Sequence, residues 1–487
     1  QYIQQNSITD ETCAPYVALS HYEGRKCTPQ AICNECTPSS GCAVPKKYNT
    51  YKISAYGSVN GELNMMKEIL QNGPIPCAVD SNPLHNFTGT WEIITDPGQS
   101  INHIVSVVGW GIDNGTKYWI LRNSWGEYFA NEGYARVLKG DGGAIMIESN
   151  CAWATPIDTW SGQPYPKSEE PKEETKEETI IEKVEEIERN VENMLEDLFS
   201  SKKEFKKELL EDHENPWKLD LPAEVIKTAS PNDYIDVEDI PANFWWGNAN
   251  GTNYLSWTIN QHLPQYCGSC WAQAALAAFA DRVNIKTNNS FPKLAMSVQQ
   301  ILNCAAGGTC HGGSLNGVYQ FAHQHYIVEF GCQVYTASDP AKAQCSAIQN
   351  CMNCKWGPNY EQICDPVTSH FNQWYASEYG PATGKANMQK EIFARGPITC
   401  GMYVTDDFYN NYKGGIYKSP VQTSGANHAV SVVGWGNDAT AGDYWIVRNS
   451  WGTWWGESGY FRITMGTGNL GIGVNSCYWA VPSQTKR

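Results

Sequence analysis

Two stretches of nearly the same sequence, about 325 residues apart, show that this chain contains a duplication. Residues 102–111 and 427–436 share the pattern Asn-His-x-Val-Ser-Val-Val-Gly-Trp-Gly. Each is followed, at residues 118–126 and 444–452, by Tyr-Trp-Ile-x-Arg-Asn-Ser-Trp-Gly. The spacing is far longer than the roughly 20–50 residues of solenoid repeats. We therefore predict a tandem duplication of a whole domain, which fits the several domains expected for 487 residues.

The two copies are unequal. Residues 1–5 align with residues 320–324, so the first copy has no counterpart to the segment around Cys270. We expect the chain to enter the first copy partway through its domain. The predicted division is a partial domain at residues 1–158, a linker at residues 159–230 and a complete domain at residues 231–487.

The linker is strongly charged. Residues 160–215 hold 18 acidic and 9 basic residues, so they carry much of the net charge of −16. Apolar residues recur at three- and four-residue spacing from Ile180 to Leu198, which predicts an amphipathic helix that extends toward residue 210. A solvated linker helix is the simplest interpretation. A coiled-coil contact through the 180–210 helix and an inhibitory pro-segment are the alternatives.

Composition excludes several classes of function. The sequence has no apolar run long enough for a membrane span and no basic cluster that would favour nucleic acid as a partner. Eighteen cysteines indicate an oxidising compartment. Acceptor sites for N-glycosylation agree with passage through the secretory route and lie at Asn86, Asn114, Asn250 and Asn288.

Residues 265–272, Gln-Tyr-Cys-Gly-Ser-Cys-Trp-Ala, carry the strongest chemical signal. The sequence after Cys270 is rich in Ala and predicts a helix that begins there, and a helix N-terminus lowers the pKa of a thiol. His428 opens an apolar strand, and Asn449 can accept its imidazole N–H, with Trp451 shielding that bond from water. A thiol, an imidazole and an amide in these contexts suit nucleophilic catalysis.

These residues resemble the papain family of cysteine peptidases. The resemblance implies an α+β fold of two lobes, a helical lobe that carries Cys270 and a β-barrel-like lobe that carries His428 and Asn449. It implies that the fold is duplicated in tandem, with an N-terminally truncated first copy. No metal site and no organic cofactor are implied, and the expected partner is a peptide or protein substrate.

Further site residues follow from the same resemblance. Gln261 matches the oxyanion-hole glutamine of the family, which acts together with the nucleophile's own backbone N–H. Gly312 and Gly313 match the backbone that binds an extended peptide, and Trp451 is placed with this substrate-binding set.

The loop after Gln261 narrows the resemblance. It begins with His262 and is longer than in papain, and it is similar to the mini-loop of the cathepsin Z (cathepsin X) branch. In that branch the loop blocks the primed side and its His holds the substrate's terminal carboxylate. The resemblance therefore implies a carboxypeptidase that removes single residues, anchored by His262, in a lysosome or digestive vacuole or outside the cell. Gln273 departs from it, because this branch has His there.

Two alternatives stay open from the sequence alone. One is a cysteine endopeptidase in which the loop at His262 is displaced. The other is a tandem binding module without catalysis. The intact set of Cys270, His428, Asn449 and Gln261 argues against the second alternative for the second copy. In the first copy His103 and Asn123 match the base and its amide partner, but no nucleophile accompanies them, so we expect no catalysis there.

The cysteines also match the family. Eleven lie in the second copy, and without Cys270 their number is even. Cys27 in the first copy has its expected partner in the segment which that copy lacks. The disulfides implied by the resemblance are Cys267–Cys310, Cys304–Cys345, Cys332–Cys351, Cys354–Cys364, Cys400–Cys477, Cys13–Cys33, Cys36–Cys42 and Cys77–Cys151.

Overall fold

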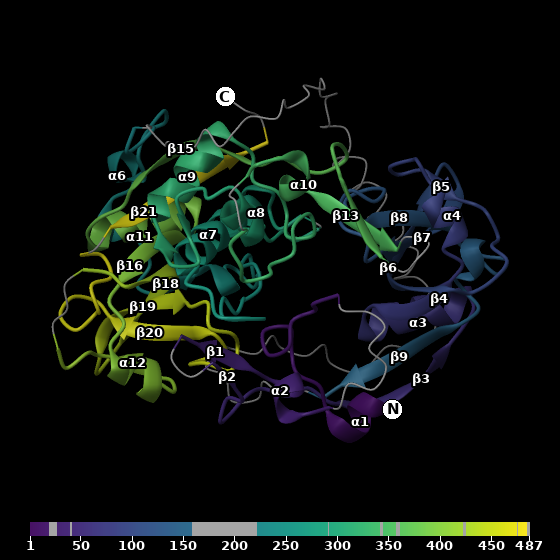
Figure 1. The fold of residues 1–487 in the computed structure, drawn as a ribbon, viewed down its shortest axis with the longest axis horizontal. Coiled ribbons are helices and arrows are strands. Elements are labelled where there is room, and N and C mark those ends of the chain that lie inside the picture. The colour runs from purple at the N-terminus through teal and green to yellow at the C-terminus, as the bar shows by residue number, and fades with distance from the viewer. Residues whose placement is uncertain are drawn as a thin grey trace. The chain divides into compact units, whose positions relative to one another are not determined.

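The computed structural model describes residues 1–18, 27–38, 41–157, 222–290, 292–340, 344–356, 361–421, 425–474 and 476–484 (Figure 1). The linker helix predicted at residues 180–210 lies outside these residues. The chain forms two compact units, which are described one at a time. The first comprises Gln1–Ser7, Tyr51–Glu211 and Ser369–Phe371, and the second comprises Ile8–Thr50, Asp212–Thr368 and Asn372–Arg487.

The first unit is built on a seven-stranded sheet with the order β3-β9-β4-β6-β7-β8-β5. Neighbouring strands are antiparallel except β5 and β8, which are parallel. Along β4 the buried residues alternate, as expected for a strand with one face on a core, and Ile75 and Val79 pack with Met65 and Ile69 of helix α3. The elements are α1 (Tyr2–Asn6), β3 (Ile53–Val59), α3 (Glu62–Asn72), β4 (Ile75–Val79), α4 (Asn82–His85), β5 (Ile93–Ile94), β6 (His103–Asp113), β7 (Thr116–Arg122), β8 (Tyr134–Leu138), η1 (Ala144–Met146) and β9 (Cys151–Pro156).

The sheet of the second unit repeats this topology. Its strand order is β15-β21-β16-β18-β19-β20-β17, with β10 added on β18. Both sheets have the same register shift, between Val107 and Gly109 in one and between Val432 and Gly434 in the other. The elements are β10 (Phe244–Trp245), β15 (Tyr375–Pro381), α11 (Lys385–Arg395), β16 (Ile398–Met402), α12 (Asp406–Asn411), β17 (Ile416–Tyr417), β18 (His428–Asp438), β19 (Gly442–Arg448), β20 (Tyr460–Thr464) and β21 (Cys477–Ser483). The shared topology agrees with a duplicated fold.

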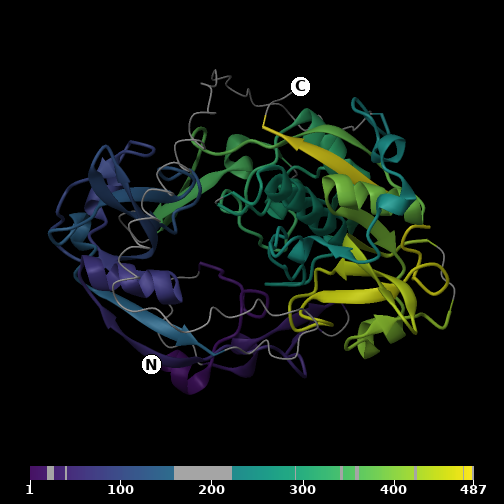
Figure 2. The same cartoon turned by 180° about the vertical axis from the view of Figure 1, so that it is seen from behind.

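A helical part accompanies this second sheet, as Figure 2 shows from behind. Its centre is helix α7, which is buried on nearly all sides, as expected for a helix without a polar face. The predicted α+β fold, with separate helical and β-rich parts, is confirmed. The remaining elements are α6 (Pro231–Tyr234), η2 (Val237–Asp239), η3 (Trp246–Asn248), α7 (Cys270–Lys286), α8 (Val298–Asn303), β11 (Gly308–Thr309), β12 (Gly312–Gly313), α9 (Leu315–Gln324), α10 (Ala347–Asn350), β13 (Met352–Trp356) and β14 (Gln362–Pro366).

A buried ion pair connects helix α7 with the sheet. The Arg448 guanidinium at the end of β19 donates to the Asp281 carboxylate across 2.5 Å, and both side chains are almost fully buried. The backbone and hydroxyl of Ser256 also donate to Asp281, across 2.7 and 2.8 Å. Because Arg448 directly precedes Asn449, this contact holds the helix of Cys270 against the strand that leads to Asn449.

Residues Ile8–Thr50, named here the docked segment, fold with the second unit although the repeat places them in the first copy. The docked segment contains α2 (Pro29–Ile32), β1 (Glu35–Thr37) and β2 (Gly41–Ala43). Sequence similarity thus groups residues 1–158 together, whereas packing divides them between the two units. The physical reason is that the docked segment has buried polar partners on the second unit, described below.

Eight disulfides join the same pairs of cysteines that the resemblance implies. They are Cys13–Cys33, Cys36–Cys42, Cys77–Cys151, Cys267–Cys310, Cys304–Cys345, Cys332–Cys351, Cys354–Cys364 and Cys400–Cys477. Cys27 is exposed, and Cys270 keeps its thiol. In the described part of the chain, no helix has both the length and the apolar character needed to cross a membrane.

Candidate active site

Cys270 is the first residue of helix α7, as its Ala-rich sequence predicts. The side chain is partly exposed. The backbone N–H groups of Ala429, Trp271 and Cys270 itself lie close enough to its sulfur to favour the thiolate and so lower the thiol pKa in part. Ala429 directly follows His428 in strand β18, so the structure brings the thiol beside the strand that carries the imidazole.

The protonation of Cys270 and His428 differs from the prediction of a lowered thiol pKa. Burial raises the pKa of the Cys270 thiol, and the three backbone N–H groups only partly offset this. The lowered thiol pKa expected from the helix N-terminus is therefore wrong, because desolvation outweighs it. Burial lowers the pKa of His428 to about 4, the Asn449 hydrogen bond opposes this, and nearby His262 adds to it. Both shifts favour a neutral thiol and a neutral imidazole in the resting site.

His428 is fixed by an amide and an indole. Its Nε2 donates to Asn449 Oδ1 across 2.8 Å, and this bond is buried. The ring of Trp451 lies over the imidazole, with 4.7 Å between the ring centroids. Because Asn449 engages Nε2, the other ring nitrogen, Nδ1, is the one available for proton exchange with a thiol.

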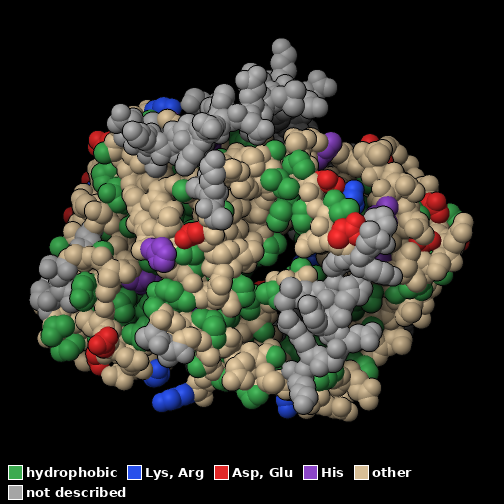
Figure 3. Space-filling view, viewed as in Figure 1, with side chains coloured by type: hydrophobic (Ala, Val, Ile, Leu, Met, Phe, Trp, Pro, Cys, Tyr) green, Lys and Arg blue, Asp and Glu red, His purple; other side chains and the backbone are tan. Residues whose placement is uncertain are grey.

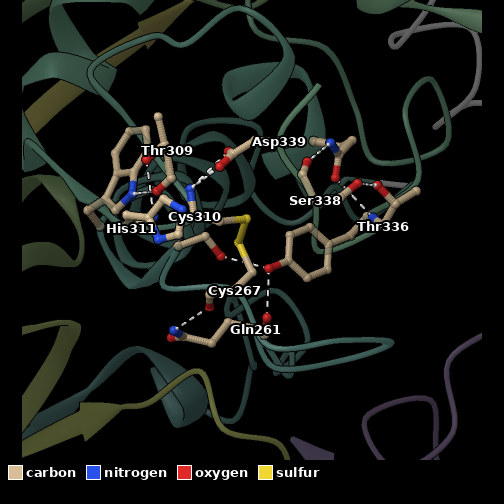
Figure 4. The surroundings of a disulfide bond; sticks show 12 residues. Gln261, Cys267, Thr309, Cys310, His311, Thr336, Ser338 and Asp339 are labelled. Carbon is tan, nitrogen blue, oxygen red and sulfur yellow. Dashed lines mark hydrogen bonds between the residues drawn. A yellow bond between two sulfur atoms is a disulfide. The ribbon is translucent and has the colours of Figure 1, made fainter. Parts of the chain in front are cut away.

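Gln261 is buried, and its amide orientation is set by two hydrogen bonds. Its Oε1 accepts from Ser450 Oγ across 2.6 Å, and its Nε2 donates to the carbonyl of Cys267 across 3.1 Å. Figure 4 shows the Gln261 amide directed at Cys267, beside the Cys267–Cys310 disulfide. The donor side of the amide therefore faces the segment that ends at Cys270.

Gly312 and Gly313 form the exposed strand β12, which pairs with β11. A Cβ atom at Gly313 would lie 2.5 Å from the ring of Trp271, so only glycine allows this close packing. Trp271 also donates its indole N–H to the Thr309 carbonyl across 3.0 Å. The hairpin is thereby held beside the start of α7, and its glycine backbone is exposed.

His262 has a partner that the sequence did not reveal. Its Nδ1 lies 2.5 Å from Oε1 of Glu35, and the two side chains are 7% and 8% exposed. Asn260 Nδ2 donates to the other oxygen, Oε2, across 2.9 Å. No sequence signal points to Glu35, because it lies in the first copy, far along the chain from His262.

In the first unit, His103 and Asn123 meet as His428 and Asn449 do in the second. His103 Nε2 and Asn123 Oδ1 are 2.9 Å apart, and Trp125 stacks on the imidazole at 5.1 Å. Cys77 and Cys151, the cysteines of this unit's sequence, are joined in a disulfide. This unit therefore brings an imidazole and an amide together, while both of its cysteines are joined in a disulfide.

A bound metal ion would need several His, Cys, Asp or Glu ligands close together. Within the described residues, His, Cys, Asp and Glu side chains form no group of three that could hold a metal ion. On the face drawn in Figure 3, acidic and basic side chains are scattered among polar and apolar ones.

Known cysteine proteases share sequence with this chain. The family model "Papain family cysteine protease" matches residues 1–155 and 240–480. Cathepsin Z of Onchocerca volvulus is 40% identical over 253 residues, which is 50% of this chain and 79% of that protein. Cathepsin B-like cysteine proteinase 4 of Caenorhabditis elegans is 31% identical over 262 residues, 49% of this chain and 74% of that protein. The bromelain protease of Ananas comosus is 27% identical, with 50% of this chain and 99% of that structure covered, at a TM-score of 0.38. The chain belongs to the papain family of cysteine proteases, whose family model matches it in two tandem segments, and half of it is similar to cathepsin Z.

Proposed function

We propose that the second unit is a carboxypeptidase in which Cys270 is the nucleophile and His428 the proton carrier. The observation that supports this most is that Cys270 begins helix α7 beside the backbone N–H of Ala429, while the preceding residue, His428, is held by Asn449. In the first unit the same imidazole and amide meet without a thiol, so the proposal assigns activity to the second unit alone.

The chemistry follows from the neutral resting pair. His428 Nδ1 takes the thiol proton as sulfur attacks the substrate carbonyl, and a C–S bond forms while the carbonyl becomes an oxyanion. Gln261 Nε2 and the backbone N–H of Cys270 stabilise that oxyanion, at about 3 kcal/mol for each donor. The C–N bond then breaks, and His428 gives its proton to the leaving amine. Water, deprotonated by His428, hydrolyses the acyl-enzyme and restores the thiol.

Selection of the terminal residue is assigned to His262. Asn260 and His262 together, named here the carboxylate clamp, place one donor on each oxygen of a carboxylate, as they do for Glu35. Gly312 and Gly313 would bind the peptide backbone on the other side of Cys270. The similarity to cathepsin Z supports this choice over an endopeptidase. A lysosome, a digestive vacuole or the extracellular space is the proposed location, which fits the eight disulfides.

The test is hydrolysis of one peptide made with a free and with an amidated C-terminus. We expect the whole chain to cleave the free acid by one residue and to spare the amide. Cys270→Ala should abolish cleavage, and His103→Ala, the matched change in the first unit, should leave it intact. Equal cleavage of acid and amide at internal bonds would support an endopeptidase instead. Complete inactivity of folded, reduced protein would support a binding module.

A further inference from the structure

The carboxylate clamp holds a carboxylate of the chain itself. Glu35 of the docked segment offers Oε1 to His262 at 2.5 Å and Oε2 to Asn260 at 2.9 Å, so each oxygen has its own donor. The clamp is also held in shape, because Asn260 Oδ1 accepts the backbone N–H of His262 across 3.0 Å. With Oδ1 engaged in this way, the amide must present Nδ2 to the carboxylate.

The docked segment also covers the loop that follows Trp451. Thr453 donates its backbone N–H to Thr12 Oγ1 across 2.9 Å, and its hydroxyl donates to Asp10 Oδ2 across 2.6 Å. Asn260 Nδ2 donates to the Thr12 carbonyl as well, across 3.0 Å. The docked segment is therefore bound to both the His262 loop and the Trp451 loop.

We propose that Glu35 occupies the place of a substrate's terminal carboxylate, so that the docked segment inhibits carboxypeptidase activity within the same chain. This inference rests on the proposed function, which assigns the carboxylate clamp to the substrate's terminus. A glutamate side chain and a peptide C-terminus present the same group, two equivalent oxygens on one carbon, and the clamp cannot distinguish them by hydrogen bonding.

The two carboxylates exclude one another. His262 is already almost fully covered, so no second acceptor can reach it while Glu35 is in place. Two carboxylates in one site would also repel, because like charges a few ångströms apart cannot both stay ionised cheaply. A substrate carboxylate can therefore bind the clamp only after the docked segment has left it. The apparent affinity for free-acid substrates is reduced by the fraction of time for which the clamp is open.

The proposed inhibition concerns the carboxylate clamp and not the other residues of the candidate site. Gly312, Gly313 and Gln261 are not among the residues that hold Glu35, and Cys270 remains partly exposed. We thus expect inhibition of ligands that need the clamp and little effect on ligands that do not. A C-terminal amide lacks the charge and provides the matched ligand.

The experiment measures binding apart from catalysis. In a whole-chain Cys270→Ala background, the Kd of one peptide is measured by calorimetry as the free acid and as the amide, with and without Glu35→Gln. A glutamine can accept from His262, but its NH₂ then faces the NH₂ of Asn260, so the isosteric change breaks half of the contact. Glu11→Gln is the control, because Glu11 is an exposed carboxylate of the same docked segment.

We expect Glu35→Gln to lower the Kd of the free acid by at least about tenfold. This factor applies if Glu35 leaves the clamp open for about a tenth of the time or less. The amide should change less than about twofold, and Glu11→Gln should change neither. Unchanged or weaker binding of the acid in Glu35→Gln would overturn the proposal and make Glu35 a residue that positions His262. This assay needs no turnover, so tighter binding of the acid in Glu35→Gln would support occupation of the clamp by Glu35 even if the chain with Cys270 proved inactive. If that chain hydrolyses peptides but the Kd is unchanged in Glu35→Gln, the inhibition proposal is overturned and the proposed function is not.

Discussion

Removal of the Asp281 carboxylate should cost the second unit much of its stability. Asp281 accepts the Arg448 guanidinium and two donors of Ser256, with its side chain fully buried. Asp281→Ala leaves the Arg448 charge buried without its main counter-charge, which typically costs about 3–5 kcal/mol. For a unit of this size, with an unfolding entropy of about 2.1 cal/mol/K per residue, that is a fall in Tm of roughly 4–8 °C.

The assay is thermal unfolding followed by tryptophan fluorescence, together with kcat at a temperature where every variant is folded. Asp365→Ala is the control, because Asp365 pairs with Lys355 at the surface, where an ion pair is worth about 0–1 kcal/mol. Adding Arg448→Met to Asp281→Ala should recover part of the loss, since no charge is then stranded. We also expect kcat to fall, because Asp281 lies about three helical turns after Cys270. A cost below about 1 kcal/mol for Asp281→Ala, equal to that of Asp365→Ala, would refute the reasoning.

Three further outcomes are expected. Gln261→Ala should lower kcat by about 10²–10³-fold with little change in KM, measured by steady-state kinetics, and a change confined to KM would contradict an oxyanion role. Because burial lowers the pKa of His428 to about 4, the unfolded chain takes up this proton first as the pH falls. The contribution of neutral His428 to the free energy of unfolding is thus fully present above pH 6.5 and falls by about 3 kcal/mol toward pH 4. Urea unfolding at a series of pH values should show this slope, and His428→Gln should remove it. Gly313→Ala should destabilise the unit by about 1–3 kcal/mol through overlap with Trp271, whereas an unchanged Tm would show that the hairpin moves freely.

Much of the fold and site could be predicted because local sequence determined it. The helix that begins at Cys270 follows from an apolar, Ala-rich run, and β18 follows from the apolar residues after His428. Repeated motifs identified the duplication, and the two sheets share one strand order. The disulfide pairs required the family resemblance, since cysteine spacing alone allows many pairings.

Other features depend on contacts between distant parts of the chain. The carboxylate of Glu35 meets His262 across 227 positions, and neither local sequence predicts the other. Repetition also assigned residues 8–50 to the copy they resemble, whereas their packing depends on surfaces that sequence similarity does not encode. The raised pKa of Cys270 was missed for a related reason, because desolvation depends on the whole surrounding fold.

The placement of the docked segment has a consequence for biosynthesis. Glu35 and Asn260 are separated by 225 residues, which a ribosome adds in roughly 10–45 s at about 5–20 residues per second. During that interval the docked segment has no second unit to bind. Its disulfides, Cys13–Cys33 and Cys36–Cys42, span only 20 and 6 residues and can close before the second unit exists. A nascent chain can thus carry the docked segment with both disulfides closed before the carboxylate clamp has been synthesised. The clamp would then meet Glu35 as soon as it forms.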